Sequence, residues 1–209
     1  MIRILIADDH SMIRRGLREI LLDEFGDASI TEASTGTELL KLAQSREWDI
    51  LISDISMPGQ NGLDILKQLK EQFPNKPILI LSMHPEDQYA IRALRAGAAG
   101  YLTKESASNE LVAAVRKVLA GKRYISATVA EKLAETLDKD AEKALHETLS
   151  DREFAVMKLL ASGSSVSEVA NTLSLSVTTI STFRARILKK MGLKSNADLT
   201  QYAIHNQLI

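Results

Sequence analysis

The stretch LISDISMPGQNG, residues 51–62, decides the fold of the first part of the chain. Its apolar start predicts a buried strand, which runs into Asp54 before a turn at Pro58–Gly59 and an amphipathic segment from Gly62. A buried strand followed by a turn and an amphipathic helix is half of a β-α-β unit. A carboxylate at the carboxyl end of such a strand loses part of its hydration, which costs free energy. Its presence there therefore suggests a chemical role.

The same strand-then-helix pattern occurs five times in the first 120 residues. Short apolar runs predict strands, and segments with apolar residues three and four apart predict the helices between them. The predicted strands are residues 2–7, 29–33, 49–53, 77–82 and 99–103. The predicted helices are residues 11–25, 37–45, 62–73, 87–97 and 108–121. This alternation predicts an α/β fold, a five-stranded doubly wound parallel sheet with helices on both faces.

The C-terminal third of the chain has helical patterns throughout. Ser150–Glu153 and Ser165–Glu168 are capping boxes ahead of apolar helical faces, and Ser176 is the expected cap of a longer helix that ends at Gly192. A short helix, a tight turn and a longer helix make the helix-turn-helix pattern. With a further helix over residues 195–207, the sequence predicts a second, all-α four-helix domain.

A charged, alanine-rich segment separates the two parts. Residues 122–147 show no strand pattern and are predicted to be a helical linker, or a helix followed by a flexible stretch. The expected organisation is therefore a first domain over 1–121, this linker, and a second domain over 148–209. A chain of 209 residues can form two such small cores.

Composition excludes several classes of protein. The formal net charge is −1, so the whole chain is neither a polybasic nor an acidic tail. The absence of cysteine excludes disulfides and thiolate metal sites and fits a reducing compartment. No apolar run approaches the roughly 18 residues of a membrane span, and no signal segment precedes the first strand. The expectation is a soluble, cytoplasmic protein without a membrane partner.

Polar side chains follow several of the predicted strands. Asp8 and Asp9 follow the first strand, Asp54 the third, Ser82 ends the fourth, and Lys104 comes just after the fifth. Ligands of open parallel sheets bind beyond the carboxyl ends of the strands, and in the order 2-1-3-4-5 the first and third strands are neighbours. Three carboxylates are therefore expected to converge, with a hydroxyl and an ammonium beside them.

Three carboxylates packed together repel one another, and a divalent cation relieves that repulsion. A carboxylate-rich oxygen site suits Mg²⁺, which keeps several waters and commonly shares phosphate oxygens. We therefore predict that Asp54 accepts a phosphoryl group as an aspartyl phosphate. Lys104 is expected to pair with the phosphoryl oxygens, and Ser82 to donate a hydrogen bond to them.

Each of these residues has a plainer interpretation when it is taken singly. Asp9 could simply cap the first helix, and Asp54 could begin a turn. The conjunction of all five residues at strand ends is what predicts a site. The four histidines, His10 among them, show no metal-ligand spacing and are interpreted as ordinary surface or helix-end residues.

Formal charge is uneven along the chain. Residues 147–209 carry seven basic and five acidic side chains, a net charge of +2, which leaves −3 for residues 1–146. The positive charge concentrates on the longer helix of the second domain, where no acid occurs between 177 and 190. Basic side chains in such a place favour contacts with nucleic-acid phosphates. They also complement a helix dipole, and four helices can be a simple packing module.

The two sides of that helix differ in character. Its inward stripe is predicted to consist of Val177, Ile180, Ile187, Leu188 and Met191. The opposite side carries small polar residues near the end that enters a major groove, and basic residues beyond them. The predicted DNA contacts are Thr178, Ser181, Thr182, Arg184, Ala185, Arg186, Lys189 and Lys190.

These motifs resemble a known family. The segments LIADDH, SDISMPGQNG, ILILSMH and GAAGYLTK resemble the receiver domain of bacterial two-component response regulators. The segment that begins LSDREFAVMKLLASG at residue 149 is similar to the LuxR-type helix-turn-helix output domain. In this order the two halves resemble NarL/FixJ-type transcription regulators over nearly the whole chain.

The resemblance implies a flavodoxin-like receiver with Asp54 as the phosphoacceptor. It implies that Mg²⁺ is bound directly by Asp9 and Asp54, through water by Asp8, and by the backbone carbonyl of Ser56. The implied partners are a sensor histidine kinase, double-stranded promoter DNA and, on phosphorylation, a second copy of the chain.

The resemblance also implies a conformational switch. Ser82 would move toward the phosphoryl group, Tyr101 would follow, and Lys104 would hold the phosphoryl oxygens. Without the resemblance, Tyr101 is interpreted as plain core packing. The chain departs from the family pattern in the output half, where Ser181 and Phe183 replace a basic residue and a histidine. That departure concerns the DNA sequence preference rather than DNA binding.

The leading hypothesis is a phosphorylation-switched transcription factor that is not an enzyme. One alternative is an enzyme with an aspartate nucleophile, such as a phosphatase. Such enzymes usually carry a second acid two residues after the nucleophile, where this chain has Ser56, and a cap or pocket, whereas the loops here are short. A regulator that binds DNA without phosphorylation is a third class, and the complete acid set argues against it.

Overall fold

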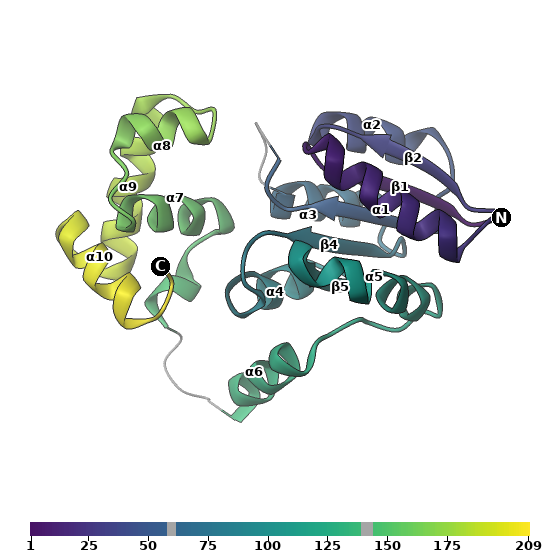
Figure 1. Ribbon diagram of the computed structural model, residues 1–209. Helices are drawn as coiled ribbons and strands as arrows, with labels where there is room; N and C mark the ends of the chain where they lie inside the picture. Colours follow the sequence, from purple (N-terminus) through teal and green to yellow (C-terminus); the bar gives the residue numbers. More distant parts are fainter. Residues whose placement is uncertain (58–61, 139–143) are drawn as a thin grey trace. The chain divides into compact units, whose positions relative to one another are not determined.

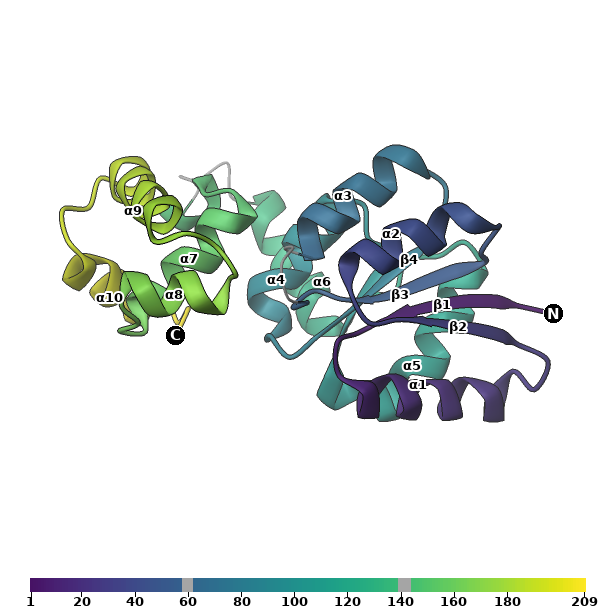
Figure 2. The same cartoon turned by 90° about the horizontal axis from the view of Figure 1, so that it is seen from above.

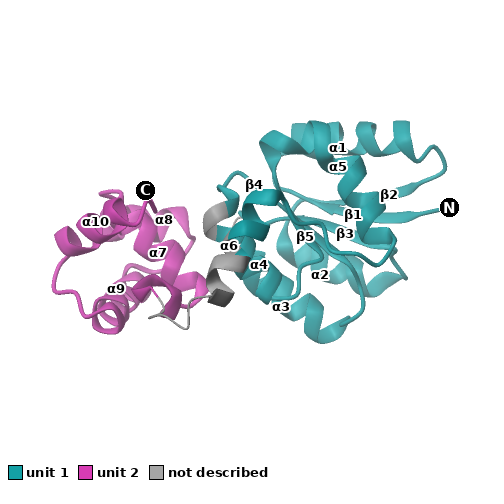
Figure 3. Cartoon of the chain, turned by 90° about the horizontal axis from the view of Figure 1, so that it is seen from below, with its two compact units in different colours: residues 1–138 teal, residues 139–209 magenta. Residues whose placement is uncertain are grey.

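The fold is taken from a computed structural model. The structure describes residues 1–57, 62–138 and 144–209. The chain divides into two compact units, residues 1–138 and 139–209 (Figure 3). The predicted turn at Pro58–Gly59 and residues 139–143 of the predicted linker lie outside the described residues. Within the described part of the chain, no helix is long and apolar enough to cross a membrane.

The first unit is a five-stranded parallel sheet in the order β2-β1-β3-β4-β5, with helices on both faces (Figure 1). Its strands are β1 (Arg3–Ala7), β2 (Ser29–Ala33), β3 (Ile50–Asp54), β4 (Ile78–Ser82) and β5 (Gly100–Thr103). Its helices are α1 (Ser11–Glu24), α2 (Gly36–Ser45), α3 (Gly62–Gln72), α4 (Glu86–Arg95), α5 (Lys104–Leu119) and α6 (Ala127–Asp138). Figure 2 shows α1 and α5 on the face opposite α2 and α3. The predicted fold class and strand order are confirmed.

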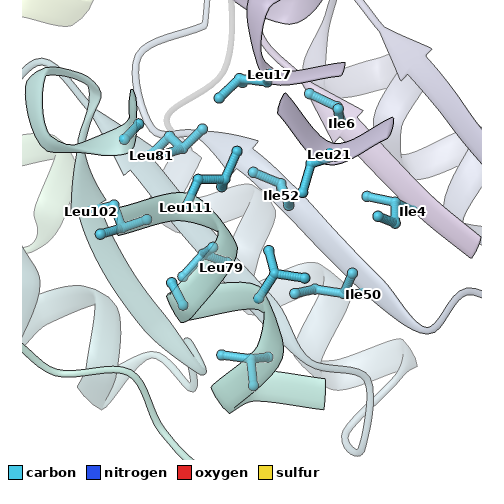
Figure 4. Close-up of a cluster of buried hydrophobic side chains, with 14 residues drawn as sticks. Ile4, Ile6, Leu17, Leu21, Ile50, Ile52, Leu79, Leu81, Leu102 and Leu111 are labelled. Carbon is cyan, nitrogen blue, oxygen red and sulfur yellow. The ribbon is translucent and has the colours of Figure 1, made fainter. Parts of the chain in front are cut away.

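One face of the sheet packs against α1 and α5 (Figure 4). Residues two apart on a strand share a face, so Ile4 and Ile6 of β1 lie in register with Ile50 and Ile52 of β3. All four are fully buried. Every residue of β3 is buried, which is why that strand is a nearly continuous apolar run in the sequence. This core fixes the register that brings the carboxyl ends of β1 and β3 together.

Helix α5 begins at Lys104, four residues before the predicted start at 108. The side chain of Thr103 accepts a hydrogen bond of 3.1 Å from the backbone N–H of Ser106, which caps the helix there. The first turn of α5 consists mostly of polar residues, so apolar periodicity does not indicate that the helix begins there. As a result, Lys104 is anchored both by the end of β5 and by the start of a helix.

The segment predicted to be a linker, 122–147, contains α6, which packs against α4 within the first unit. Before α6, the backbone N–H of Tyr124 donates to the carbonyl of Ala99 at 2.8 Å. Tyr124 also forms an isolated bridge with Gly100 of β5. The chain that leaves α5 therefore stays attached to the edge of the sheet before it enters α6.

The second unit is helical. It contains a 3₁₀ turn, η1 (Leu145–Thr148), and the helices α7 (Asp151–Ala161), α8 (Val166–Thr172), α9 (Val177–Met191) and α10 (Asn196–His205). Both predicted capping boxes are present, and a further one joins Ser195 and Asp198 at α10. Ser176 caps α9, and Gly192 ends it in the left-handed conformation, φ 66°. A short α8 and a longer α9 joined by a tight turn confirm the predicted helix-turn-helix.

One predicted core position on α9 is wrong. Ile180, Ile187 and Met191 are buried as expected and Leu188 is partly buried, but Val177 is 50% exposed. Val177 is the first residue of α9, directly after the cap, so it lies beyond the turns that pack on the domain core. The apolar spacing alone does not show where the covering helices stop.

A substitution at Gly62 tests the packing behind the site. A Cβ on Gly62 would lie 2.4 Å from Cα of Ile55, and the Gly62 N–H donates to the Ile55 carbonyl at 3.0 Å. We expect Gly62→Ala to lower the free energy of unfolding by about 2 kcal/mol, because backbone must shift to admit the methyl group. Gly16→Ala on α1 is the matched control, since a Cβ there meets nothing within 4 Å.

The control substitution should raise the free energy of unfolding by about 1 kcal/mol, because alanine favours a helix over glycine. Denaturant titration of both variants measures the two changes. Equal shifts, or a stabilised Gly62→Ala variant, would contradict the close backbone contact.

Candidate functional site

Asp8, Asp54 and Lys104 form a buried ionic cluster at the carboxyl end of the sheet. Asp54 ends β3, and Asp8 follows β1, the neighbouring strand. Nζ of Lys104 lies 2.6 Å from Oδ2 of Asp8 and 2.7 Å from Oδ2 of Asp54. The three side chains are 0%, 1% and 4% exposed in that order. The fold therefore brings together three residues that the sequence places on three different strand ends.

Asp9 and His10 complete the acidic edge. Ligand atoms of Asp8, Asp9, His10 and Asp54 all lie within 4.8 Å of one another. Nδ1 of His10 lies 2.8 Å from Oδ1 of Asp9 and 3.2 Å from Oδ1 of Asp8. His10 is the N-cap of α1, so its interpretation as a helix-end residue describes its place but misses its contacts with the acids. The sequence shows His10 directly after the acid pair, but the absence of metal-ligand spacing among the histidines led to the plainer interpretation.

Two carboxylate oxygens of this cluster are suited to a cation. Oδ2 of Asp8 and Oδ1 of Asp9 are buried and accept no well-oriented hydrogen bond from the residues that the structure describes. Their contacts are the ion pairs with Lys104 and His10. Carboxylate oxygens are the ligands that Mg²⁺ prefers, so the donor set fits a divalent cation of this type.

The charges of Asp54 and Lys104 depend on each other. Burial raises the pKa of Asp54, while hydrogen bonds from Lys104 and from the backbone N–H of Ser56, 2.9 Å from Oδ1, act in the opposite direction. Burial lowers the pKa of Lys104, but its hydrogen bond to Asp54 and its ion pair with Asp8 outweigh this effect and raise that pKa overall. Lys104 is thus held as a cation by the two carboxylates with which it pairs, and its single charge does not balance both of them.

Ser82 and Tyr101 lie on the neighbouring strands β4 and β5, and both are buried. His84 connects them: the Tyr101 hydroxyl donates to the His84 carbonyl at 2.9 Å, and the His84 N–H donates to Oγ of Ser82 at 3.0 Å. The His84 ring stacks on Tyr89, with centroids 4.5 Å apart, and its Nε2 lies 3.2 Å from Oγ of Ser56. Burial raises the pKa of Tyr101, so its hydroxyl remains a donor. No sequence signal pointed to His84 as this link.

The predicted DNA contacts lie along α9. Most of them are exposed: Thr178, Ser181, Thr182, Ala185, Arg186, Lys189 and Lys190. Arg184 is half-buried, and its Nε donates to Oδ1 of Asn196 at 2.7 Å. Nζ of Lys190 donates to Oε2 of Glu153, the capping-box residue of α7, at 2.6 Å. Two of the predicted contacts therefore also join α9 to its neighbours.

The comparison with protein families assigns both units. The response regulator receiver domain family matches residues 4–116, and the luxR family of bacterial regulatory proteins matches residues 147–203. The chain belongs to the two-component response regulators. The order of its domains, a receiver followed by a luxR-type helix-turn-helix, is that of the NarL/FixJ family.

Relatives align with this response regulator over its whole length. It is 34% identical to the response regulator UvrY of Escherichia coli K12, over 100% of this chain and 96% of the relative. It is 33% identical to the response regulator GacA of Pseudomonas aeruginosa, over 100% of this chain and 98% of that one. Among solved structures, RcsB of Salmonella enterica serovar Typhimurium bound to promoter rprA with the phosphomimetic BeF₃⁻ matches with a TM-score of 0.65 and 27% identity, covering 97% of this chain and 98% of RcsB.

Proposed function

We propose that this response regulator takes up a phosphoryl group on Asp54 and so controls its own dimerisation and the transcription of the promoters that it binds. The observation that carries the proposal is the buried cluster of Asp54, Asp8 and Lys104 at the carboxyl end of the sheet. A sensor histidine kinase is the proposed phosphodonor, and the cytoplasm the proposed compartment.

The residues of the cluster have distinct proposed roles. Asp8, Asp9, Asp54 and the backbone carbonyl of Ser56 would hold Mg²⁺, which supplies positive charge that offsets the repulsion among the carboxylates and the incoming group. A carboxylate oxygen of Asp54 forms the new bond to phosphorus, and the leaving group of the donor departs with the electrons of its own bond. The Lys104 ammonium pairs with the transferred oxygens as a point charge.

Ser82 and Tyr101 are the proposed switch pair. In the structure Oγ of Ser82 accepts from the His84 N–H, and the Tyr101 hydroxyl donates to the His84 carbonyl. If the Ser82 hydroxyl turns to donate to a phosphoryl oxygen, its hydrogen bond from the His84 N–H changes. Tyr101 is bonded to the carbonyl of the same His84, so it is affected in turn. The signal then passes to α4, which begins two residues after His84.

The output unit is proposed to bind double-stranded promoter DNA through α9. For the chain as a whole, the proposed functional boundaries are 1–121 for the receiver, 122–147 for the linker and 148–209 for the output domain. The proposed contacts are Thr178, Ser181, Thr182, Arg184, Ala185, Arg186, Lys189 and Lys190. RcsB, which resembles this chain, has been solved on promoter DNA and as dimers bound to DNA, and this supports a homodimer on two half-sites.

The coupling between the two units can be tested with beryllofluoride, a phosphoryl mimic. With Mg²⁺ and beryllofluoride, we expect sedimentation to show a shift from monomer to dimer, and titration to show higher affinity for DNA with two half-sites. A single output domain of this size offers few contacts, so a dimer should bind far more tightly. Asp54→Asn is the control that should not respond. If mass and affinity both stay unchanged in the wild type, the coupling is wrong.

Turnover of a free substrate is not part of this proposal. The family comparisons assign a transcription regulator to the chain. An aspartate-nucleophile phosphatase usually places a second acid where this chain has Ser56, whose hydroxyl contacts His84 instead. Stoichiometric labelling supports the switch, whereas steady hydrolysis of an added phosphate ester would support the phosphatase.

A further inference from the structure

Arg14, on the first turns of α1, connects three parts of the receiver unit. Its NH1 donates to the backbone carbonyl of Asp8 at 2.6 Å, and its Nε donates to Oε2 of Glu32 at 3.2 Å. The Arg14 side chain is 15% exposed, so these contacts lie largely out of water. Glu32 belongs to the edge strand β2, in register with Ile6 of β1, and its Oε1 lies 3.5 Å from NH1 of Arg18. Both oxygens of Glu32 therefore face arginines of α1.

The carbonyl that Arg14 contacts belongs to the peptide group between Asp8 and Asp9. A peptide group is planar, so fixing this oxygen fixes the plane from which both acidic residues project. The backbone N–H of Asp8 is also bonded, to the carbonyl of Ala33 at 3.2 Å. The backbone at the two acids is thus tied on one side to β2 and on the other to α1.

We propose that Arg14, oriented by Glu32, is a positioning residue for the cation site, which holds Asp8 and Asp9 in place without touching the cation. The inference rests on the proposed Mg²⁺ site. Residues that hydrogen-bond to metal ligands without binding the metal orient those ligands, and removing them commonly lowers metal affinity 10- to 100-fold. Arg14 is suited to this role because its planar fork donates to two acceptors in fixed directions.

Positioning and simple charge predict effects of opposite sign. A guanidinium close to the acids repels a cation, so if Arg14 acted only through its charge, removing it would tighten Mg²⁺ binding. If Arg14 acts by orientation, removing it loosens the loop and weakens Mg²⁺ binding. The direction of the change therefore separates the two accounts.

The test is calorimetric titration of the full-length chain with MgCl₂. We expect Arg14→Met and Arg14→Lys both to weaken Mg²⁺ affinity about tenfold, because lysine keeps the charge but not the planar fork. Glu32→Gln keeps an acceptor for Arg14 but loses the charge assistance, so it should weaken affinity by only about threefold. Arg15→Met is the matched control, because Arg15 lies on the same helix, is 78% exposed and pairs with Glu19.

A second readout separates positioning from damage to the fold. In phosphodonor labelling, the Arg14 variants should need about tenfold more Mg²⁺ for half-maximal rate, yet reach the wild-type rate at saturating Mg²⁺. If Arg14→Met does not fold, Arg14→Lys and Glu32→Gln decide the question. If the wild type binds Mg²⁺ and these variants bind it equally well or more tightly, the positioning role is overturned but the proposed cation site is not. Absence of Mg²⁺ binding by the wild type overturns the proposed cation site, and the positioning role with it.

Discussion

Asp54→Asn should abolish phosphoryl uptake completely. Wild-type chain incubated with Mg²⁺ and a small phosphodonor such as acetyl phosphate is expected to gain up to one phosphoryl group, seen as a mass increase of the intact protein. The asparagine amide is a poor nucleophile, and it also removes one of the carboxylates expected to hold the cation. Because the amide matches the carboxylate in size, the buried position should tolerate the change, and thermal unfolding checks this.

The matched control for this variant is Asp49→Asn. Asp49 precedes β3, the strand that Asp54 ends, and contacts Arg3 rather than the acidic edge. It undergoes the same chemical change at the opposite end of the same strand, so labelling should remain at the wild-type level. Normal labelling of Asp54→Asn, or equal loss in the two variants, would show that the acceptor lies elsewhere.

Reversing two charges on α9 should remove most of the affinity for DNA. Arg186 and Lys189 are both exposed. Lys190 is bonded to Glu153, and Arg184 is bonded to Asn196. Reversing the charge of Lys190 or Arg184 would therefore also disturb packing. If Arg186 and Lys189 each neutralise one phosphate, losing both contacts should lower affinity about 50-fold at 0.1 M salt. The double variant Arg186→Glu/Lys189→Glu should lose this affinity for all sequences alike.

The dependence on salt identifies the cause of that loss. The slope of log affinity against log salt should become shallower by about 0.9 for each phosphate contact removed. Arg15→Glu changes net charge as each reversal does, but in the receiver unit, and should have little effect. Thr182→Ala should instead relax sequence preference and leave the slope unchanged. An unchanged slope in the double variant would show that α9 does not face the phosphates.

Local patterns in the sequence determined the architecture. Apolar runs alternating with helical spacing predicted the strands and the parallel sheet, because a strand buried on both faces is apolar along its length. The order of the strands was taken as the commonest one for a five-stranded sheet of this type, and the structure has it. Ser150 and Ser165 marked helix starts correctly, since a cap acts within one turn of its own helix. The start of α5 was misplaced, because Thr103 caps a first turn that is mostly polar. Val177 was misplaced because spacing does not show which turns are covered.

The acid cluster was predictable because residues at the ends of parallel strands must meet at one edge of the sheet. Asp8, Asp54 and Lys104 needed no side-chain detail for that inference.

Only the tertiary structure decided the contacts between elements that are far apart in the chain. His84 joins Ser82 to Tyr101 through its backbone, and Arg14 holds the Asp8 carbonyl while Glu32 holds Arg14. Lys190 is bonded to Glu153 across 37 residues. Such contacts depend on side-chain directions after packing and carry no periodicity or spacing, so a single sequence cannot display them.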